Sequence, residues 1–287
     1  MKFEVLEPRT LDEAVNLLGE NPEETRVIAG GQSLLLMIRS GLVMPRFLLS
    51  LSHLKELGAI RLTPENNIYI GATVTHREIL NSQLLSGRAG MLLQAVFRIG
   101  STPVRNFGTL GGNLCHNEMG SDPPPALLAL NASVECISAR GKRKLVMGDF
   151  FTGYFETSLR PDEILTGIEI PSVPSDLKHI YLKHTFRSGD LALVGVAAMI
   201  GMRDGACDEL RLALGGVGPV PFRAIEAEKL GSHRKLDNGV IDAVAVAAAD
   251  AADPMSDAHA SADYRRKMIR VFVRRALPEL ASAGERA

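Results

Sequence analysis

Along the first half of the chain, stretches in which apolar and polar residues alternate are followed by stretches with an apolar residue every three or four positions. Alternation is typical of half-buried strands, and the longer spacing is typical of amphipathic helices. In chain order the patterns predict strand 3–8, helix 10–20, strand 25–31, helix 34–41, and a repeat of strand and helix over 47–54 and 67–80. This order predicts a mixed α+β fold.

From residue 86 onward the patterns predict further helices and longer strands. A helix at 86–100 precedes the segment 101–113, which is too rich in Gly, Pro and Asn for regular structure to be expected. Beyond it the patterns predict a helix from 123, strands at 133–138, 162–171, 179–186, 191–202 and 209–218, and helices at 222–231, 239–253 and 263–280. The segment 171–178 groups two prolines with Ser, Asp and Lys. We therefore expect two domains, at 1–173 and 177–287.

The composition is that of a globular protein with no electrostatic preference for nucleic acid. Of 287 residues, 46% are hydrophobic and 23% are charged, which is compatible with the cores of two domains. The formal net charge of -1 and the absence of Trp disfavour a surface that binds nucleic acid. No apolar run is long enough for a secretory signal or a membrane span, so we expect a cytoplasmic protein.

Three cysteines, Cys115, Cys136 and Cys207, stand far apart and form no C-x-x-C pair. This spacing excludes a disulfide framework and disfavours a zinc or iron–sulfur site within the chain. Cys115 precedes His116, but adjacent residues of an extended segment point to opposite sides, so packing is a better interpretation than a ligand or nucleophile pair. Any iron–sulfur cluster must then be held by another chain.

Two diglycine turns are the candidate binding features. The first, "AGGQS", follows the strand at 25–31 and precedes a helix whose expected N-cap is Ser33, and the second, "TLGGN", occurs about eighty residues later. Glycines let a backbone approach a diphosphate, and a helix N-terminus favours an anion. Neither turn matches G-x-G-x-x-G or a phosphate loop ending in G-K-[ST], which disfavours a nicotinamide-binding or NTPase fold. Each turn alone would more often be a simple tight turn.

Six blocks occur in this order: "AGGQSLLLMIRSGL", "IGATVTHREI", "IGSTPVRNFGTLGGNLCHNEMGSDPPPALLAL", "EILTGIEIP", "RSGDLALVGVAA" and "DYRRKMIRVFVRRAL". Together they resemble the FAD-binding medium subunit of the molybdenum hydroxylases, the xanthine dehydrogenase and carbon monoxide dehydrogenase family. The resemblance spans essentially the whole chain. It implies two α+β subdomains of the vanillyl-alcohol oxidase and MurB type that clamp an extended FAD, followed by a small α+β C-terminal flavoprotein domain.

The resemblance also implies FAD-binding positions, and it implies no catalytic residue and no metal ligand in this chain. Residues 29–34 would form one pyrophosphate cradle and residues 109–113 the other. Asp122 would accept from a polar part of the cofactor, Leu165 would pack near the adenine, and Lys183 would lie near the flavin. The implied positions are Ala29, Gly30, Gly31, Gln32, Ser33, Leu34, Thr75, His76, Ile99, Thr109, Leu110, Gly111, Gly112, Asn113, Asp122, Leu165 and Lys183.

A division of labour between subunits is a further implication of the resemblance. A large subunit would hydroxylate the substrate at a molybdenum cofactor, and two iron–sulfur clusters on a small subunit would carry electrons to the FAD. The FAD would deliver them to NAD, a quinone or oxygen, and the assembly would be a dimer of heterotrimers, that is, a heterohexamer. Because a flavin carries the redox chemistry itself, the lack of an acid–base dyad does not count against an enzyme.

Other interpretations of single residues stay open at this point. Asp122 precedes Pro123 and could be only a helix N-cap. Lys183 on an alternating strand would ordinarily point into solvent. In the helix 263–280, apolar residues recur with helical spacing opposite Arg and Lys, which predicts a core-facing stripe with a solvated basic face more than a partner surface. The stripe comprises Met268, Ile269, Phe272, Val273 and Ala276.

Two departures from the family pattern keep rival functions open. The segment "CHNEMG" replaces small residues, and Leu191 stands where an aromatic residue often lies against the flavin. A self-sufficient MurB-like flavin oxidoreductase and a flavin-free assembly scaffold are therefore alternatives. The substrate is not indicated, because in this family the large subunit selects it; carbon monoxide, an aldehyde, a purine or other N-heterocycle, and an aromatic coenzyme A thioester all remain.

Overall fold

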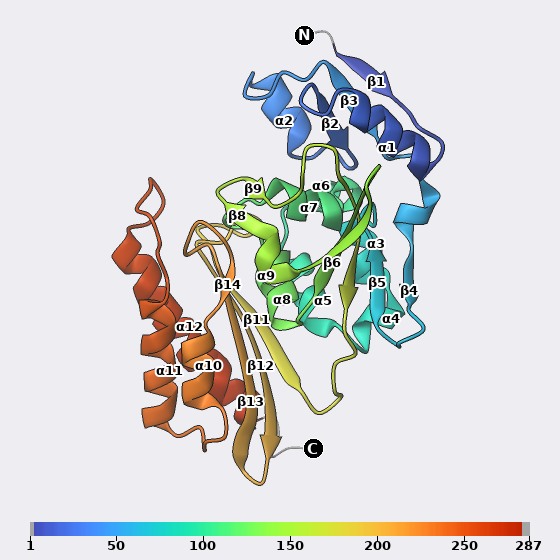
Figure 1. Cartoon of the computed structure of the whole chain (residues 1–287). Coiled ribbons are helices and arrows are strands. Elements are labelled where there is room, and N and C mark those ends of the chain that lie inside the picture. The colour runs from blue at the N-terminus through green and yellow to red at the C-terminus, as the bar shows by residue number, and fades with distance from the viewer. Residues whose placement is uncertain (1–2, 283–287) are drawn as a thin grey trace.

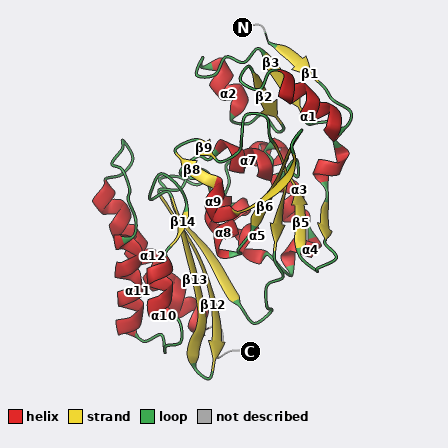
Figure 2. Cartoon of the chain, viewed as in Figure 1, coloured by secondary structure: helices red, strands yellow, loops and turns green. Residues whose placement is uncertain are grey.

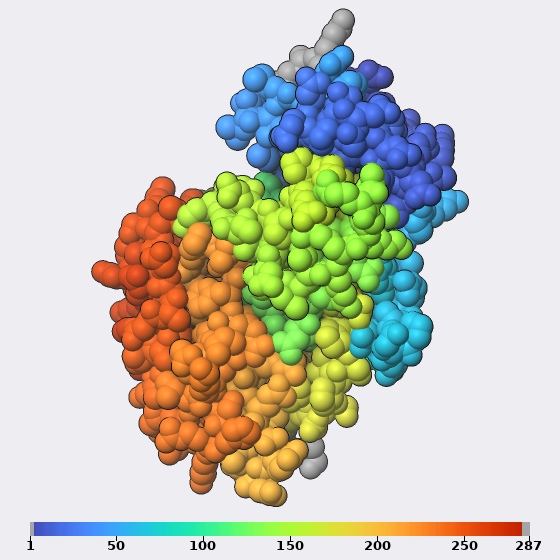
Figure 3. All heavy atoms as spheres, viewed as in Figure 1, coloured from blue at the N-terminus to red at the C-terminus, as the bar shows by residue number. Residues whose placement is uncertain are grey.

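Three units of mixed helix and strand make up the part of the chain that the computed structural model describes, residues 3–282 (Figures 1 and 2). Residues 1–2 and 283–287 of the predicted domains lie outside the described residues. We call the three parts the N-terminal unit (3–54), the central unit (55–170) and the C-terminal unit (178–282). In Figure 3 the N-terminal unit forms a lobe on top of the central unit, and the C-terminal unit packs along the side of the central unit.

The N-terminal unit is a small parallel sheet with two helices. Strands β1 (Glu4–Leu6), β2 (Thr25–Ile28) and β3 (Phe47–Ser50) lie in the order β1-β3-β2, with helices α1 (Leu11–Glu20) and α2 (Leu34–Arg39) between them in sequence. The side chain of Thr10 caps α1 by accepting from the amide of Glu13 at 3.2 Å. The amphipathic face of α1 buries Ala14 and Leu18 in the small core of this unit. The strand and helix order predicted for this region is therefore confirmed.

The central unit is an antiparallel sheet in the order β4-β5-β10-β6-β7, covered by short helices. Its elements are η1 (Lys55–Gly58), β4 (Ile60–Leu62), β5 (Ile68–Gly71), α3 (His76–Asn81), α4 (Gln83–Ser86), α5 (Gly90–Phe97), α6 (Thr102–Phe107), α7 (Leu110–His116), α8 (Pro123–Ala129), β6 (Ser133–Ser138), β7 (Gly141–Val146), α9 (Met147–Phe150), β8 (Phe151–Gly153), β9 (Glu156–Thr157) and β10 (Ile164–Ile170). The prolines at the start of α8 occupy its first turn, as the sequence predicts.

The expectation that 101–113 lacks regular structure is wrong, because the segment contains α6 and most of α7. Pro103 lies in the first turn of α6, where its missing amide costs no helical hydrogen bond. The side chain of Thr109 caps α7 by accepting from the amide of Gly112 at 3.1 Å. The helix 86–100 is also shorter than predicted, since α5 covers only its central part. The Thr109 cap of α7 and tertiary packing here outweigh the poor helix propensity of Gly and Asn.

The C-terminal unit is a four-stranded antiparallel sheet whose outer face carries three helices (Figure 1). Its elements are β11 (Lys178–His184), β12 (Val194–Arg203), β13 (Ala206–Gly215), β14 (Phe222–Arg223), α10 (Ile225–Gly231), α11 (Asn238–Asp250) and α12 (Ala262–Ser282). Alternate residues of β12 enter two cores: Ala197 and Met199 face the central unit, and Val196 and Ala198 face the helices. The strand is apolar throughout because both of its faces are covered.

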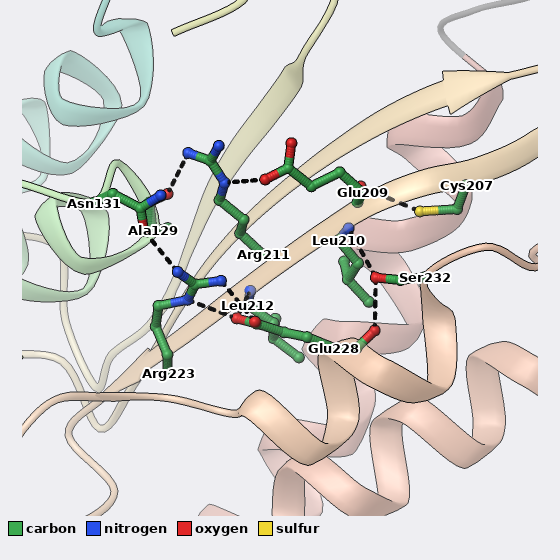
Figure 4. A network of polar contacts seen from close by, with 10 residues as sticks. All are labelled: Ala129, Asn131, Cys207, Glu209, Leu210, Arg211, Leu212, Arg223, Glu228 and Ser232. Carbon is green, nitrogen blue, oxygen red and sulfur yellow. Dashed lines mark hydrogen bonds and ion pairs between the residues drawn. The ribbon is translucent and has the colours of Figure 1, made fainter. Parts of the chain in front are cut away.

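Side-chain contacts join the C-terminal unit to the central unit (Figure 4). Arg223 donates to the Asn131 side chain at 2.6 Å, and Arg211 donates to the carbonyl of Ala129 at 3.3 Å. Both arginines lie on the sheet. Ala129 is the last residue of helix α8, and Asn131 follows that helix. The carboxylate of Glu228 on α10 receives two hydrogen bonds from Arg223 and one from the amide of Leu212. These contacts hold helix α8, including its first turn, against the sheet.

Candidate functional site

A cavity of about 700 Å³ lies where the three units meet. The loop after β2 contributes Gly30 from the N-terminal unit, the turn before α7 contributes Thr109 from the central unit, and β11 contributes Lys183 from the C-terminal unit. The first diglycine turn packs against the segment just before the second, because a Cβ on Gly30 would lie 2.0 Å from the carbonyl oxygen of Phe107. Only glycine permits this approach of two backbones.

The first diglycine loop offers a row of backbone amides. No group within residues 3–282 accepts a hydrogen bond from the amides of Gly30, Gly31, Gln32, Ser33 or Leu34. Gly31 has a left-handed φ of 69°, which turns the chain from β2 into α2. The expected capping bond of Ser33 is absent. These half-buried amides face the cavity, and successive amides in a turn are suited to an anion.

The second diglycine turn is organised differently. The amide of Leu110 donates to the carbonyl of Val74, and the amide of Gly111 donates to the carbonyl of Ala72. A Cβ on Gly111 would lie 2.6 Å from that same carbonyl oxygen, so this glycine serves the close packing of α7 on the strand end. The amide of Gly112 is bonded to the Thr109 side chain. The turn therefore presents the exposed Cα of Gly112 to the cavity and few free donors.

His76 lines the cavity and is 2% exposed. Its neighbour Thr75 forms a full capping box with Glu78 at the start of α3 and pairs with Thr109 in an antiparallel bridge. Within the described residues the Nδ1 atom of His76 has no hydrogen-bond partner. Burial, together with the charge of Arg105, lowers the pKa of His76 to about 4, so the ring is neutral at neutral pH.

A buried ion pair also lines the cavity. The Asp122 carboxylate accepts from Lys183 at 2.8 Å and from the Tyr181 hydroxyl at 2.7 Å. The side chains of Asp122 and Lys183 are each 4% exposed. Burial raises the pKa of Asp122, while the ammonium group and the two hydrogen bonds oppose that shift. Lys183 also donates to the carbonyl of Arg98 at 3.1 Å.

This geometry decides between the alternatives for two residues. Asp122 makes no side-chain capping bond to α8, so its interpretation as a simple N-cap is wrong. Lys183 does not point into solvent, because the central unit covers its strand face and supplies a carboxylate.

Cys115 and His116 lie on helix α7, not in an extended segment. The thiol of Cys115 packs against the core, and burial raises its pKa to about 12, in keeping with the predicted packing role.

The cavity brings together all but two of the positions that the sequence implies. Those that line it are Ala29, Gly30, Gly31, Gln32, Ser33, Leu34, His76, Ile99, Thr109, Gly111, Gly112, Asn113, Asp122, Leu165 and Lys183. Thr75 and Leu110 lie behind the lining, where Leu110 is fully buried and Thr75 begins α3.

Several lining residues have no signal in the sequence. Arg26 lines the cavity from β2, Arg160 from the segment before β10, and His116 and Phe155 from α7 and the turn between β8 and β9. Only the fold shows that these residues line a cavity, because their sequence patterns are typical of solvated or core-packed side chains. Among residues 3–282, no cluster of three or more His, Cys, Asp or Glu could hold a metal ion, and no helix is long and apolar enough to cross a membrane.

Comparison with known proteins finds two matching families and several relatives of nearly the same length. Residues 1–173 match the family described as "FAD binding domain in molybdopterin dehydrogenase", and residues 179–280 match "CO dehydrogenase flavoprotein C-terminal domain". The glyceraldehyde dehydrogenase medium chain of Sulfolobus acidocaldarius is 35% identical, with 98% of this chain and 99% of the relative covered. The carbon monoxide dehydrogenase medium chain of Afipia carboxidovorans is 32% identical over 96% of this chain and 95% of the relative.

Solved structures give the same result. A chain of the reconstituted CO dehydrogenase from Oligotropha carboxidovorans superposes with a TM-score of 0.95 at 30% identity, covering 98% of both chains. A chain of quinoline 2-oxidoreductase from Pseudomonas putida 86 gives 0.93 at 31% identity, covering 99% of this chain and 98% of the other. These matches confirm the fold class expected from the sequence and the assignment to an oxidoreductase subunit. The chain belongs to the family of FAD-binding medium subunits of the molybdenum hydroxylases.

Proposed function

We propose that this chain is the electron-transfer subunit of a multi-subunit molybdenum hydroxylase, accepting electrons from iron–sulfur clusters of a small subunit and passing them from its FAD to NAD, a quinone or oxygen. The observation that carries the proposal is the row of unpaired amides from Gly30 to Leu34 at the edge of a cavity built by three units. A flavin-free scaffold would have no use for a row of five adjacent donors facing one cavity, whereas a diphosphate offers acceptors for several of them at once.

The residues of the cavity fit a dinucleotide. The amides of residues 30–34 would donate to the diphosphate, and the exposed Cα of Gly112 leaves room for the ligand on the other side. The buried pair of Asp122 and Lys183 would fix the wall contributed by the C-terminal unit, and His76 would remain neutral beneath it. When bound, FAD supplies the redox chemistry, and the protein binds and orients it.

The remaining FAD-contact positions are part of the same proposal. They are Ala29, Thr75, Ile99, Thr109, Leu110, Gly111, Asn113 and Leu165. Thr75 and Leu110 would act by supporting the lining, because neither faces the cavity. We also propose the domain bounds 1–173 and 177–287, which agree with the irregular segment between β10 and β11.

The partners would be a large subunit with the molybdenum cofactor and a small subunit with two iron–sulfur clusters, assembled as a dimer of heterotrimers in the cytoplasm. Two observations support a multi-subunit assembly. Relatives that match this chain over nearly their full length are named medium chains or medium subunits. The three cysteines here are far apart in sequence and two are buried, so they cannot supply a four-cysteine cluster. Relatives are named for glyceraldehyde, nicotine and carbon monoxide, so the substrate stays open.

Replacing Gln32 by Glu tests the diphosphate cradle with almost no change in shape. Gln32 is half-buried and lines the cavity beside the unpaired amides. A carboxylate at this position would repel a diphosphate, so we expect the dissociation constant for FAD to rise roughly tenfold or more, and part of the loss to be recovered in high salt.

The matched control is Gln83→Glu, which adds the same charge at an exposed position of α4 outside the cavity lining. Titration calorimetry with FAD of the original protein and both variants, each first freed of bound cofactor, gives the answer. Equal affinities of Gln32→Glu, Gln83→Glu and the original protein would show that the first diglycine loop does not hold the diphosphate.

A further inference from the structure

Phe155 has a backbone conformation that its residue type rarely adopts. It lies in the turn between β8 and β9 with a φ of 57°. The other non-glycine residues of positive φ within residues 3–282 are Asn66, Asn117, Asn131, Asp204 and His233. Asn, Asp and His are the types that tolerate this region, whereas a bulky aromatic residue there is a true outlier. The strain therefore needs a compensating cause.

Helix α7 holds the turn in this conformation. Its C-cap residue, Asn117, is 1% exposed and donates from its side chain to the carbonyls of Gly153 at 2.7 Å and Glu156 at 2.9 Å. The amide of Phe155 donates to the carbonyl of Asn117 at 3.3 Å. The two ends of the turn are thus fixed to the helix that contains the second diglycine. Gly or Asn at position 155 would form the same turn with less strain.

The side chain of Phe155 gains little from the fold itself. It is 53% exposed although it is a large apolar group, and it lines the cavity. Its aromatic neighbour is His116, at a centroid distance of 5.3 Å and an interplanar angle of 51°. Burial lowers the pKa of His116, which favours the neutral ring at neutral pH. The pair is an uncharged aromatic surface in the lining of the cavity that also contains the first diglycine loop.

We propose that Phe155, supported by His116, is a stacking wall for one of the two planar rings of the dinucleotide in this cavity. The inference rests on the proposed function, since FAD is the ligand that brings the rings. Stacking on an aromatic side chain explains why a strained, exposed Phe occupies a turn that a smaller residue would form more easily. Both the isoalloxazine and the adenine have the required chemistry, and the experiment separates them.

The test replaces Phe155 by Asn, which removes the ring and suits the left-handed backbone. We expect the dissociation constant for FAD to rise about three- to tenfold, while the unfolding midpoint stays equal or rises. Phe155→Tyr keeps a ring and is expected to bind FAD as the original protein does. Tyr154→Ser, in the same turn but outside the cavity lining, is the control expected to leave affinity unchanged.

Titrations of the Phe155→Asn protein with FMN and with ADP assign the ring. Weaker FMN binding with unchanged ADP binding supports a wall for the isoalloxazine, and the reverse supports a wall for the adenine. An FAD affinity within twofold of the original protein in both Phe155→Asn and Phe155→Gly would overturn the inference. A failure of the original protein itself to bind FAD would overturn the proposed function instead, so the two failures are distinguishable.

Discussion

Burial determines the protonation state of His76 in the cavity. His76 would be partly protonated near pH 6.5 in an unfolded chain, but its pKa is about 4 in the folded protein. Between these two values the unfolded state binds more protons, so acid favours unfolding. The contribution of His76 to stability is therefore fully present above pH 6.5 and is lost as the pH falls toward 4.

The His76→Gln variant measures this effect. We expect the free energy of unfolding of the original protein to fall by about 2 kcal/mol more than that of the variant between pH 7.5 and pH 5. Urea unfolding of both proteins at the two pH values gives the difference directly, and carboxylates that titrate in both proteins cancel. The same pH dependence in both would show that His76 is not held neutral by the fold.

The sequence singled out both diglycine turns but could not state the separate roles of their glycines. The unpaired amides of 30–34 fit the predicted anion cradle, whereas Gly111 is needed for packing on Ala72. A Gly111→Val variant would therefore lose FAD by disturbing α7, which is why Gln32→Glu is the sharper test. Asp122 and Lys183 could not be paired from the sequence, because the contact depends on how two units fold onto each other.

Among the elements, the strongly patterned ones were predicted, and several short ones without a clear periodic pattern were not. Alternation located β12 and β13 within a few residues, and helical spacing predicted the buried stripe of α12. The helices α6 and α7 were missed because their stability comes from tertiary contacts and, for α7, from the Thr109 cap. Strand β7 was missed because it is an edge strand rich in Lys and Arg, which is typical of protected edges.

Helix α12 also contains a residue whose environment the pattern did not predict. Arg265 belongs to the basic face by sequence, yet it is 1% exposed. It donates to the carbonyls of Leu193 and Gly216 and to the carboxylate of Asp257. The segments before β12 and after β13 also bond to the turn before α8, through Ala192 to Gly120 and Gly216 to Met119. Arg265 thus links α12 to the cavity wall.

The Arg265→Met variant is expected to lose about 3 kcal/mol of unfolding free energy, because Asp257 and two carbonyls lose a buried donor. Arg274→Met on the same helix removes an exposed pair with Asp242 and is the matched control, with an expected change below about 1 kcal/mol. Chemical denaturation followed by circular dichroism measures both. Similar losses in the two variants would contradict the role assigned to Arg265.

At the scale of the whole molecule, the cavity exists only because three units close around it. The N-terminal unit brings the free amides, the central unit brings the second turn and the Phe155 wall, and the C-terminal unit brings Lys183. The polar contacts of Figure 4 and the buried pair of Asp122 and Lys183 hold the last two units together. The family resemblance predicted this architecture, and periodicity alone would have predicted only a mixed α+β protein.

The measurement that tests the account most directly is the cofactor content of the purified full-length chain. The visible spectrum is recorded, the cofactor is released by heat, and the supernatant is identified by chromatography. We predict a yellow protein that carries FAD, and not FMN, at close to one molecule per chain. A colourless chain that takes up no FAD, either alone or together with its large and small partner subunits, would contradict the proposed function.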